Sequence, residues 1–130
     1  MVQKFSVTTR QHAQMLDITA EVQRAVAENG TQDGVAFIFC PHTTAGLTIN
    51  ENADPSVAAD IQETLERMVP WRANYRHTEG NAAAHVKSTL VGHSLTVLVQ
   101  AGRLARGTWQ GIFFCEFDGP RSRQVWVEVI

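Results

Sequence analysis

The sequence has no hydrophobic run long enough to cross a membrane and no excess of basic residues. A membrane-spanning helix needs about 20 consecutive apolar residues, and no stretch of the 130 residues approaches that length. Residues 1–5 are not followed by the apolar core of a signal peptide. Eleven Lys and Arg against thirteen Asp and Glu give a net charge of −2, too little positive charge for a nucleic-acid or membrane-surface partner. We therefore expect a cytoplasmic protein with no nucleic-acid and no membrane partner.

Cysteine is scarce, and the common catalytic motifs are missing. Cys40 and Cys115 lie in apolar, strand-like segments rather than at disulfide-framework spacings, so we expect two thiols that pack as small hydrophobic residues. The chain has no P-loop, no dinucleotide-binding glycine motif, no G-x-S-x-G elbow, no H-E-x-x-H helix and no C-x-x-C pair. Its sequence therefore gives no support to the common nucleotide-binding, hydrolase and zinc-finger classes.

What is present predicts one α+β domain over residues 1–130. Hydrophobic residues make up 44% of the chain and charged residues 18%, and no repeat or linker interrupts it. We expect six or seven strands in largely antiparallel, β-sandwich-like sheets, with three helices on one side. The predicted strands are 4–9, 34–40, 47–50, 95–99, 109–117 and 124–130, and the predicted helices are 19–29, 55–68 and 81–91.

Local signals place the ends and faces of these helices. Thr19 is expected to cap the first helix and Gly30 to end it, and Asp54 followed by Pro55 marks the start of the second. The second helix carries an apolar stripe, and the third has an apolar and a polar side. The stripe is Val57, Ile61, Leu65 and Met68; the two sides are Ala83, Val86 and Leu90, and Asn81, His85 and Ser88.

Two strands are apolar on both faces. The continuous apolar run 34–40 predicts a strand covered on each side. Strand 109–117 also alternates between two largely apolar faces. Because one core in a domain this small is expected to cover one face, we predict that a symmetric subunit contact covers part of the other.

The segment 40–55, CPHTTAGLTINENADP, is far more polar than a plain connection needs. His42 in this segment, His77 in the loop 71–81 and His85 on the polar side of helix 81–91 are candidate ligands of a divalent metal, with Glu51 as a fourth ligand or a general base. The alternative is that each histidine caps or bridges local backbone. Asn50 and Glu51 are equally open to a structural or a functional role, whereas Asp54 is best explained as a helix cap.

Other polar or aromatic residues are also candidates for ligand binding. Arg76, beside His77, suits a phosphate because a guanidinium fork matches phosphate oxygens. Trp109 lies between glycines, where it either packs in the core or contacts a ligand, and Gln110 needs a hydrogen-bond partner in the fold or in a ligand. His12, His93 and five further arginines resemble surface residues; these arginines are Arg72, Arg103, Arg106, Arg121 and Arg123.

Four stretches resemble the YjbQ-like proteins, which are named secondary thiamine-phosphate synthases. They are HTTAGLTINENADP (42–55), NAAAHVKSTLVG (81–92), GTWQGIFFCEFDGPR (107–121) and the spaced pattern that runs from Ser94 to Ile112, and the match extends from about residue 34 to the end. The resemblance implies an α+β fold with a β-sandwich, a homotrimer, and weak or secondary thiamine-phosphate synthase activity on small phosphorylated substrates. That reaction joins hydroxymethylpyrimidine diphosphate to thiazole phosphate and releases diphosphate.

Taken together, the polar constellation and the matched motifs give a set of expected site residues. The expected catalytic residues are His42, Asn50, Glu51, His77 and His85, of which the three histidines would bind Mg²⁺ or Zn²⁺. The expected substrate-binding residues are Thr44, Arg76, Asn81, Ser88, Thr108, Trp109 and Gln110. Two other functions stay open: a trimer that binds a metal or small anion without catalysis, and a metal-assisted hydrolase in which the same residues activate water.

Overall fold

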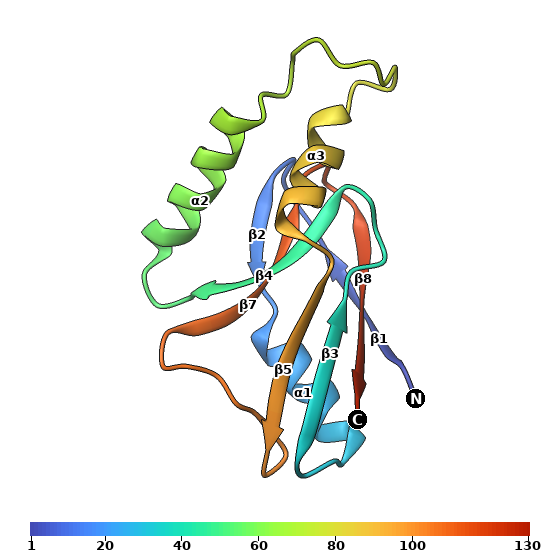
Figure 1. The fold of residues 1–130 in the computed structure, drawn as a ribbon, viewed down its shortest axis with the longest axis vertical. Coiled ribbons are helices and arrows are strands. Elements are labelled where there is room, and N and C mark those ends of the chain that lie inside the picture. The colour runs from blue at the N-terminus through green and yellow to red at the C-terminus, as the bar shows by residue number, and fades with distance from the viewer.

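The computed structural model describes residues 1–130 as two antiparallel sheets and three helices (Figure 1). The strands are β1 (Gln3–Thr8), β2 (Gln14–Asp17), β3 (Gly34–Phe39), β4 (Ala45–Glu51), β5 (Ser94–Gln100), β6 (Arg103–Leu104), β7 (Gln110–Glu116) and β8 (Ser122–Val129). The helices are α1 (Thr19–Asn29), α2 (Pro55–Met68) and α3 (Ala82–Val91). None of them is long and apolar enough to cross a membrane.

The strands form one five-stranded and one three-stranded sheet. Their orders are β1-β8-β3-β5-β6 and β2-β7-β4, and every pairing is antiparallel. This confirms the predicted α+β fold, its antiparallel sheets and its three helices. The sequence did not predict β2 and β6, which are too short to show a period of their own.

One core lies between the sheets, and a second lies under α3. The inner faces of β3, β4, β7 and β8 pack with Val22, Ala25 and Val26 of α1. On the other face of β7, Phe113, Cys115 and Phe117 pack with Ala84 of α3. Both faces of β7 are therefore covered within one chain. The inference that a subunit contact must cover one of them was wrong, because α3 and part of α2 supply the cover.

Strand β3 is covered on one face only. Ala36, Ile38 and Cys40 are fully buried, but Phe37 and Phe39 are 45% and 42% exposed. They point away from the core, next to Trp126 of β8, whose ring centroid lies 5.7 Å from that of Phe39. The prediction that both faces are covered was wrong for this chain, because no helix lies over the outer face of the larger sheet.

Helix α3 is rotated relative to the predicted face. Ala83, Ala84, Lys87 and Ser88 are buried, while Val86 and Leu90, which we expected to face the core, are exposed. The cause is close contact with β4, which small side chains permit. Ser88 Oγ donates a hydrogen bond to the carbonyl of Ala45 at 2.6 Å.

Helix α2 stands apart from the sheets (Figure 1). Its start is as predicted, since Asp54 accepts a hydrogen bond from Ser56 N at 2.9 Å. None of its residues is buried, so the apolar stripe is only partly covered. Lys87 of α3 is buried and its Nζ lies 2.5 Å from Glu66 Oε2, which ties α3 to α2. At α1, Thr19 is the first helical residue and Ile18 is the N-cap; the Thr19 hydroxyl accepts from Ile112 N instead.

Gly46→Ala is expected to lower the free energy of unfolding by about 1–3 kcal/mol. A Cβ at this position would lie 2.6 Å from the carbonyl oxygen of Gly92 and would push α3 off β4. Gly107→Ala is the matched control, because its Cβ would meet only the flexible side chain of Gln110, at 3.3 Å. Urea unfolding of both variants tests this, and equal losses would contradict the close packing of α3.

Candidate functional site

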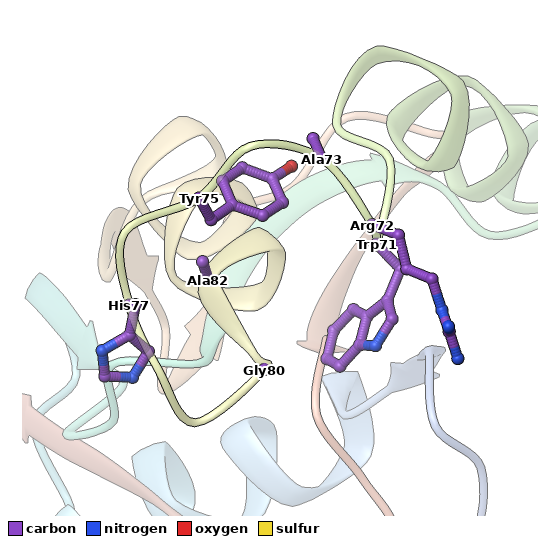
Figure 2. Close-up of a pocket in the computed structure, with 7 residues that line it drawn as sticks. All are labelled: Trp71, Arg72, Ala73, Tyr75, His77, Gly80 and Ala82. Atoms are coloured by element: carbon purple, nitrogen blue, oxygen red, sulfur yellow. The ribbon is translucent and has the colours of Figure 1, made fainter.

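A pocket of about 340 Å³ lies where the loop after α2 meets the start of α3 (Figure 2). It is lined by Trp71, Arg72, Ala73, Tyr75, His77, Gly80 and Ala82. Trp71 and Arg72 lie on one side and His77 on the other (Figure 2). The pocket therefore combines aromatic rings, a guanidinium and an imidazole beside a helix N-terminus, which suits an anion attached to a flat ring.

Contacts with other segments hold this loop in place. Tyr75 donates its hydroxyl proton to the carbonyl of Pro70 at 2.6 Å. His12 packs edge-on against Trp71, with ring centroids 4.3 Å apart. Asn81 Nδ2 donates to Asp118 Oδ2 at 2.9 Å, and Asn81 Oδ1 is buried without a partner. The pocket is thus anchored to the β1–β2 and β7–β8 connections.

His77 and His85 form a pair at the edge of this region. Their ring centroids are 5.3 Å apart in a T-shaped arrangement, and His77 Nε2 lies 3.7 Å from Glu79 Oε2. Arg76 is exposed beside them and forms no ion pair. Two imidazoles from one loop–helix junction therefore meet as the sequence predicted.

His42 has a separate environment at the β3–β4 connection. Its Nε2 accepts a hydrogen bond from Gln124 N at 2.9 Å, which leaves the proton on Nδ1. Burial, and then the nearby Arg123 guanidinium, lowers the pKa of His42, so the ring is neutral at pH 7. No three His, Cys, Asp or Glu side chains of one chain are grouped to hold a metal ion.

Beside His42 lies a buried ion pair that the sequence analysis missed. Arg123 Nε donates to Glu116 Oε1 at 2.8 Å, and a second donor, Nη2, contacts Glu116 Oε2. Arg123 also donates to Thr44 Oγ1 at 2.9 Å, so Thr44 is used inside the fold. Arg123 is therefore not a surface residue. Its place in β8 was the available signal, since it falls on the same inward face as Val125, Val127 and Val129.

Ser88 also has a partner in the fold, because its buried hydroxyl contacts His93 Nε2 at 2.9 Å as well as the Ala45 carbonyl. His93 is half-buried, not a free surface residue. Both cysteines are buried free thiols, as predicted. Burial raises the pKa of Cys40 to about 11 and that of Cys115 to about 12, so neither is a nucleophile at pH 7.

A second group of predicted residues gathers at the other end of β4 and β7. Asn50 pairs in register with Gly111, and Glu51 with Gln110. Glu51 Oε2 accepts from Asp54 N at 3.2 Å, and Gln110 Oε1 accepts from Gly107 N at 2.8 Å. Thr108 and Trp109 are exposed, Trp109 by 62%. Gln110 therefore finds its hydrogen-bond partner within the fold, and Trp109 is free of the core.

The two groups are far apart in one chain. Ser88 contacts Ala45 at the start of β4, whereas Glu51 ends the same strand. Six residue steps along a strand cover about 20 Å. Asn81, just before α3, donates to Asp118, which follows Glu116, the partner of Ala45 in the β4–β7 register. The start of α3, with His85 and the neighbouring His77, therefore lies at the Ala45 end of β4. One chain thus carries two half-sites: the histidine half-site (Arg76, His77, Asn81 and His85) and the tryptophan half-site (Asn50, Glu51, Thr108, Trp109 and Gln110).

The fold and its polar half-sites define an α+β protein of two antiparallel sheets with a cationic, aromatic pocket at one end. The chain belongs to the YjbQ/UPF0047 family: residues 3–130 match the family model described as "UPF0047 protein YjbQ-like". It is 50% identical over 131 residues to YugU of Bacillus subtilis, covering 100% of this chain and 99% of the relative. It is 49% identical over 130 residues to MJ1081 of Methanocaldococcus jannaschii, covering 100% and 94%.

Solved structures agree with the fold. A YjbQ/UPF0047 protein of Clostridium acetobutylicum superimposes with a TM-score of 0.96 at 51% identity, covering 98% of this chain and 99% of the other. The conserved hypothetical protein TT1486 of Thermus thermophilus gives a TM-score of 0.92 at 43% identity, covering 98% and 99%. None of these names states an activity.

Proposed function

We propose that this protein is a transferase with weak or secondary thiamine-phosphate synthase activity, acting in the cytoplasm on small phosphorylated substrates. The observation that carries the proposal is the pocket of Trp71, Arg72, Tyr75 and His77 at the start of α3. It offers positive charge for a diphosphate and aromatic faces for a pyrimidine or thiazole ring. The family resemblance supplies the particular reaction.

The reaction releases a diphosphate anion, and the pocket has cationic residues that can stabilise it. The C–O bond between the pyrimidine methylene and the diphosphate breaks, the diphosphate leaves with the electron pair, and the thiazole nitrogen forms the new C–N bond. Arg72 and Arg76 would stabilise the leaving anion, and Trp71 would stack on a ring. His77 or His85 would protonate the diphosphate oxygen.

The donor set fits one of the two expected metals better. A zinc site takes at least three protein ligands, and a single chain has no such group. His42, which we expected as the third ligand, already accepts a hydrogen bond from Gln124. Mg²⁺ bound by substrate phosphates needs only one or two protein carboxylates. None lines the pocket itself, but Glu79, whose Oε2 lies 3.7 Å from His77 Nε2, would supply one to an Mg²⁺ that enters with the diphosphate. When bound, it would neutralise part of the diphosphate charge.

We also propose that the active unit is a homotrimer in which the histidine half-site of one protomer faces the tryptophan half-site of the next. The separation of about 20 Å along β4 supports this, because residues at the two ends of one strand cannot contact the same substrate. Exposed apolar side chains support it too: Trp109 in the tryptophan half-site, and Met68 and Leu90 near the histidine half-site.

Incubation of the purified protein with hydroxymethylpyrimidine diphosphate, thiazole phosphate and Mg²⁺ tests the reaction. We expect thiamine phosphate and diphosphate in equal amounts. Arg72→Gln should raise the KM for the diphosphate substrate about tenfold, because it removes one charge-assisted contact. Arg24→Gln, on the exposed side of α1, is the control and should leave KM unchanged.

Three other outcomes would replace this proposal. Binding of both substrates without product would favour the non-catalytic anion-binding trimer. Release of diphosphate without thiamine phosphate would favour the hydrolase. Full activity in Arg72→Gln would remove the pocket from the reaction.

A further inference from the structure

The turn after β5 and the end of α1 lie at the opposite end of the fold from the start of α3 (Figure 1). A second and larger cavity, of about 680 Å³, is lined by residues of these two segments. Its walls are the second half of α1, the turn after it, and the segment from Ala101 to Arg106. None of the residues assigned to the proposed transferase site lines it. Its volume is within the range of about 300–1,000 Å³ that ligand pockets occupy.

Hydrogen bonds fix these walls. Gln23 of α1 spans the cavity base: its Nε2 donates to the carbonyl of Gly102 at 3.2 Å, and its Oε1 accepts from Leu104 N at 2.9 Å. Gly102 N donates to the carbonyl of Gln32 at 2.8 Å. The turn includes Ala101 with φ of 50°, a left-handed conformation that costs an alanine about 1–2 kcal/mol. Asp33 Oδ1 accepts from Ala101 N at 3.2 Å and helps to hold it.

Two arginines that form no direct ion pair line the cavity, although Asp17 is close enough to Arg106 to interact with it electrostatically. Arg103 and Arg106 form no ion pair. Arg106 donates one N–H to the carbonyl of Gln110, and a guanidinium has five such donors. The side-chain amide of Gln32 lies over Gly102 and has no hydrogen-bond partner in the fold.

We propose that this cavity is a binding site for a small, multiply charged oxyanion, either a phosphorylated or a polycarboxylate ligand of up to nucleotide size. Arg103 and Arg106 would bind the anion through paired N–H donors. Gln32 would supply a neutral donor. The two cavities share no residue. Arg106 also donates to the carbonyl of Gln110 in the tryptophan half-site, so Arg103→Gln is the variant that tests this cavity alone.

NMR titration of the ¹⁵N-labelled full chain with inorganic phosphate, pyrophosphate and citrate, added separately, tests the site. We expect saturable shifts of the amides of Gly30, Gln32 and Gly102. Arg103→Gln and Arg106→Gln should each weaken the binding that produces these shifts about tenfold or more. Arg72→Gln is the matched control: it removes the same charge from the other cavity and should leave these shifts unchanged.

The titrations distinguish a phosphorylated ligand, a polycarboxylate ligand and the absence of a site. Saturation by phosphate and pyrophosphate assigns a phosphorylated ligand, and saturation by citrate alone assigns a polycarboxylate. Absence of saturable shifts at millimolar concentrations of all three anions would overturn the proposal. Equal binding by a folded variant lacking both Arg103 and Arg106 would do the same. Lack of thiamine-phosphate synthesis would leave it intact, because the readout is local to this cavity.

Discussion

Replacing Arg123 with Met is expected to lower the free energy of unfolding by about 3–5 kcal/mol, the cost of leaving one member of a buried ion pair without its partner. Arg123 is 4% exposed and Glu116 is fully buried. The carboxylate also accepts from Thr9 Oγ1 at 2.7 Å and from Asp118 N at 3.0 Å. The pair joins β7 of one sheet to β8 of the other, so its loss weakens the contact between the sheets.

Arg121→Met is the matched control for this prediction. Arg121 pairs with Asp118 at 2.7 Å but is 49% exposed, and exposed pairs contribute at most about 1 kcal/mol. Urea unfolding at pH 7 measures both variants. A loss of less than about 1 kcal/mol in Arg123→Met would contradict the argument that the buried pair holds the sheets together.

The loss of unfolding free energy in Arg123→Met should also depend on pH, which gives a second measurement. Burial alone would raise the pKa of Glu116, but hydrogen bonds from Arg123, Asp118 and Thr9 outweigh it, and the pKa is held below its usual value of 4.5. The stabilisation is therefore fully present above pH 4.5 and is lost as the pH falls through the lower, folded-state pKa. In Arg123→Met the buried carboxyl is readily protonated. Because burial favours protonation of that carboxyl once Arg123 is gone, we expect the gap in unfolding free energy between variant and wild type to be largest near pH 8 and to narrow as the pH falls.

His85→Ala and Glu51→Gln proteins are each expected to lose at least about 100-fold in thiamine-phosphate synthesis, and trimers that mix the two are expected to regain about a quarter of wild-type activity. This prediction rests on the proposed reaction and trimer. His85 lies in the histidine half-site and Glu51 in the tryptophan half-site, at opposite ends of β4, a strand that spans about 20 Å. If each active site takes one half-site from each of two protomers, a quarter of the sites in an equal mixture contain neither change.

A mixture of His77→Ala and His85→Ala is the control. Both changes lie in the same half-site, so every site in the mixed trimer keeps one of them, and no activity should return. Recovery in both mixtures, or in neither, would contradict a site shared between protomers. If the wild type makes no product, pyrophosphate binding measured in the same mixtures gives an independent readout of the shared site.

Part of the candidate site could be predicted from the sequence, because some of its residues are close along the chain. His77 and His85 flank one loop–helix junction, and they do meet. The position of His42 depends on β8, which is remote in sequence and supplies the backbone N–H of Gln124. Trp71 lies near the histidines in sequence, but its place in the pocket depends on the loop's packing against His12.

The predictions for β7 and Arg123 were wrong because the sequence of one strand does not show what packs against it. The sequence of β7 shows two apolar faces but not that α3 packs against one of them. We therefore predicted that a subunit contact covers that face. Arg123 resembled a surface residue because its partner Glu116 lies on a strand of the other sheet. Alternation along β8 placed Arg123 on the inward face, but only the buried carboxylate makes that position tolerable for a charge.

The sequence by itself determined the local features: the capped start of α2, the end of α1 at Gly30, the alternation of the long strands and the family motifs. These depend on backbone preferences and periodicities that act over a few residues. Only the tertiary structure decided which faces are covered, which arginine is buried, and that the polar motifs separate into two half-sites. Those outcomes depend on contacts between residues far apart in sequence, such as Thr44 with Arg123, 79 residues apart, and Thr9 with Glu116, 107 residues apart, which no local pattern encodes.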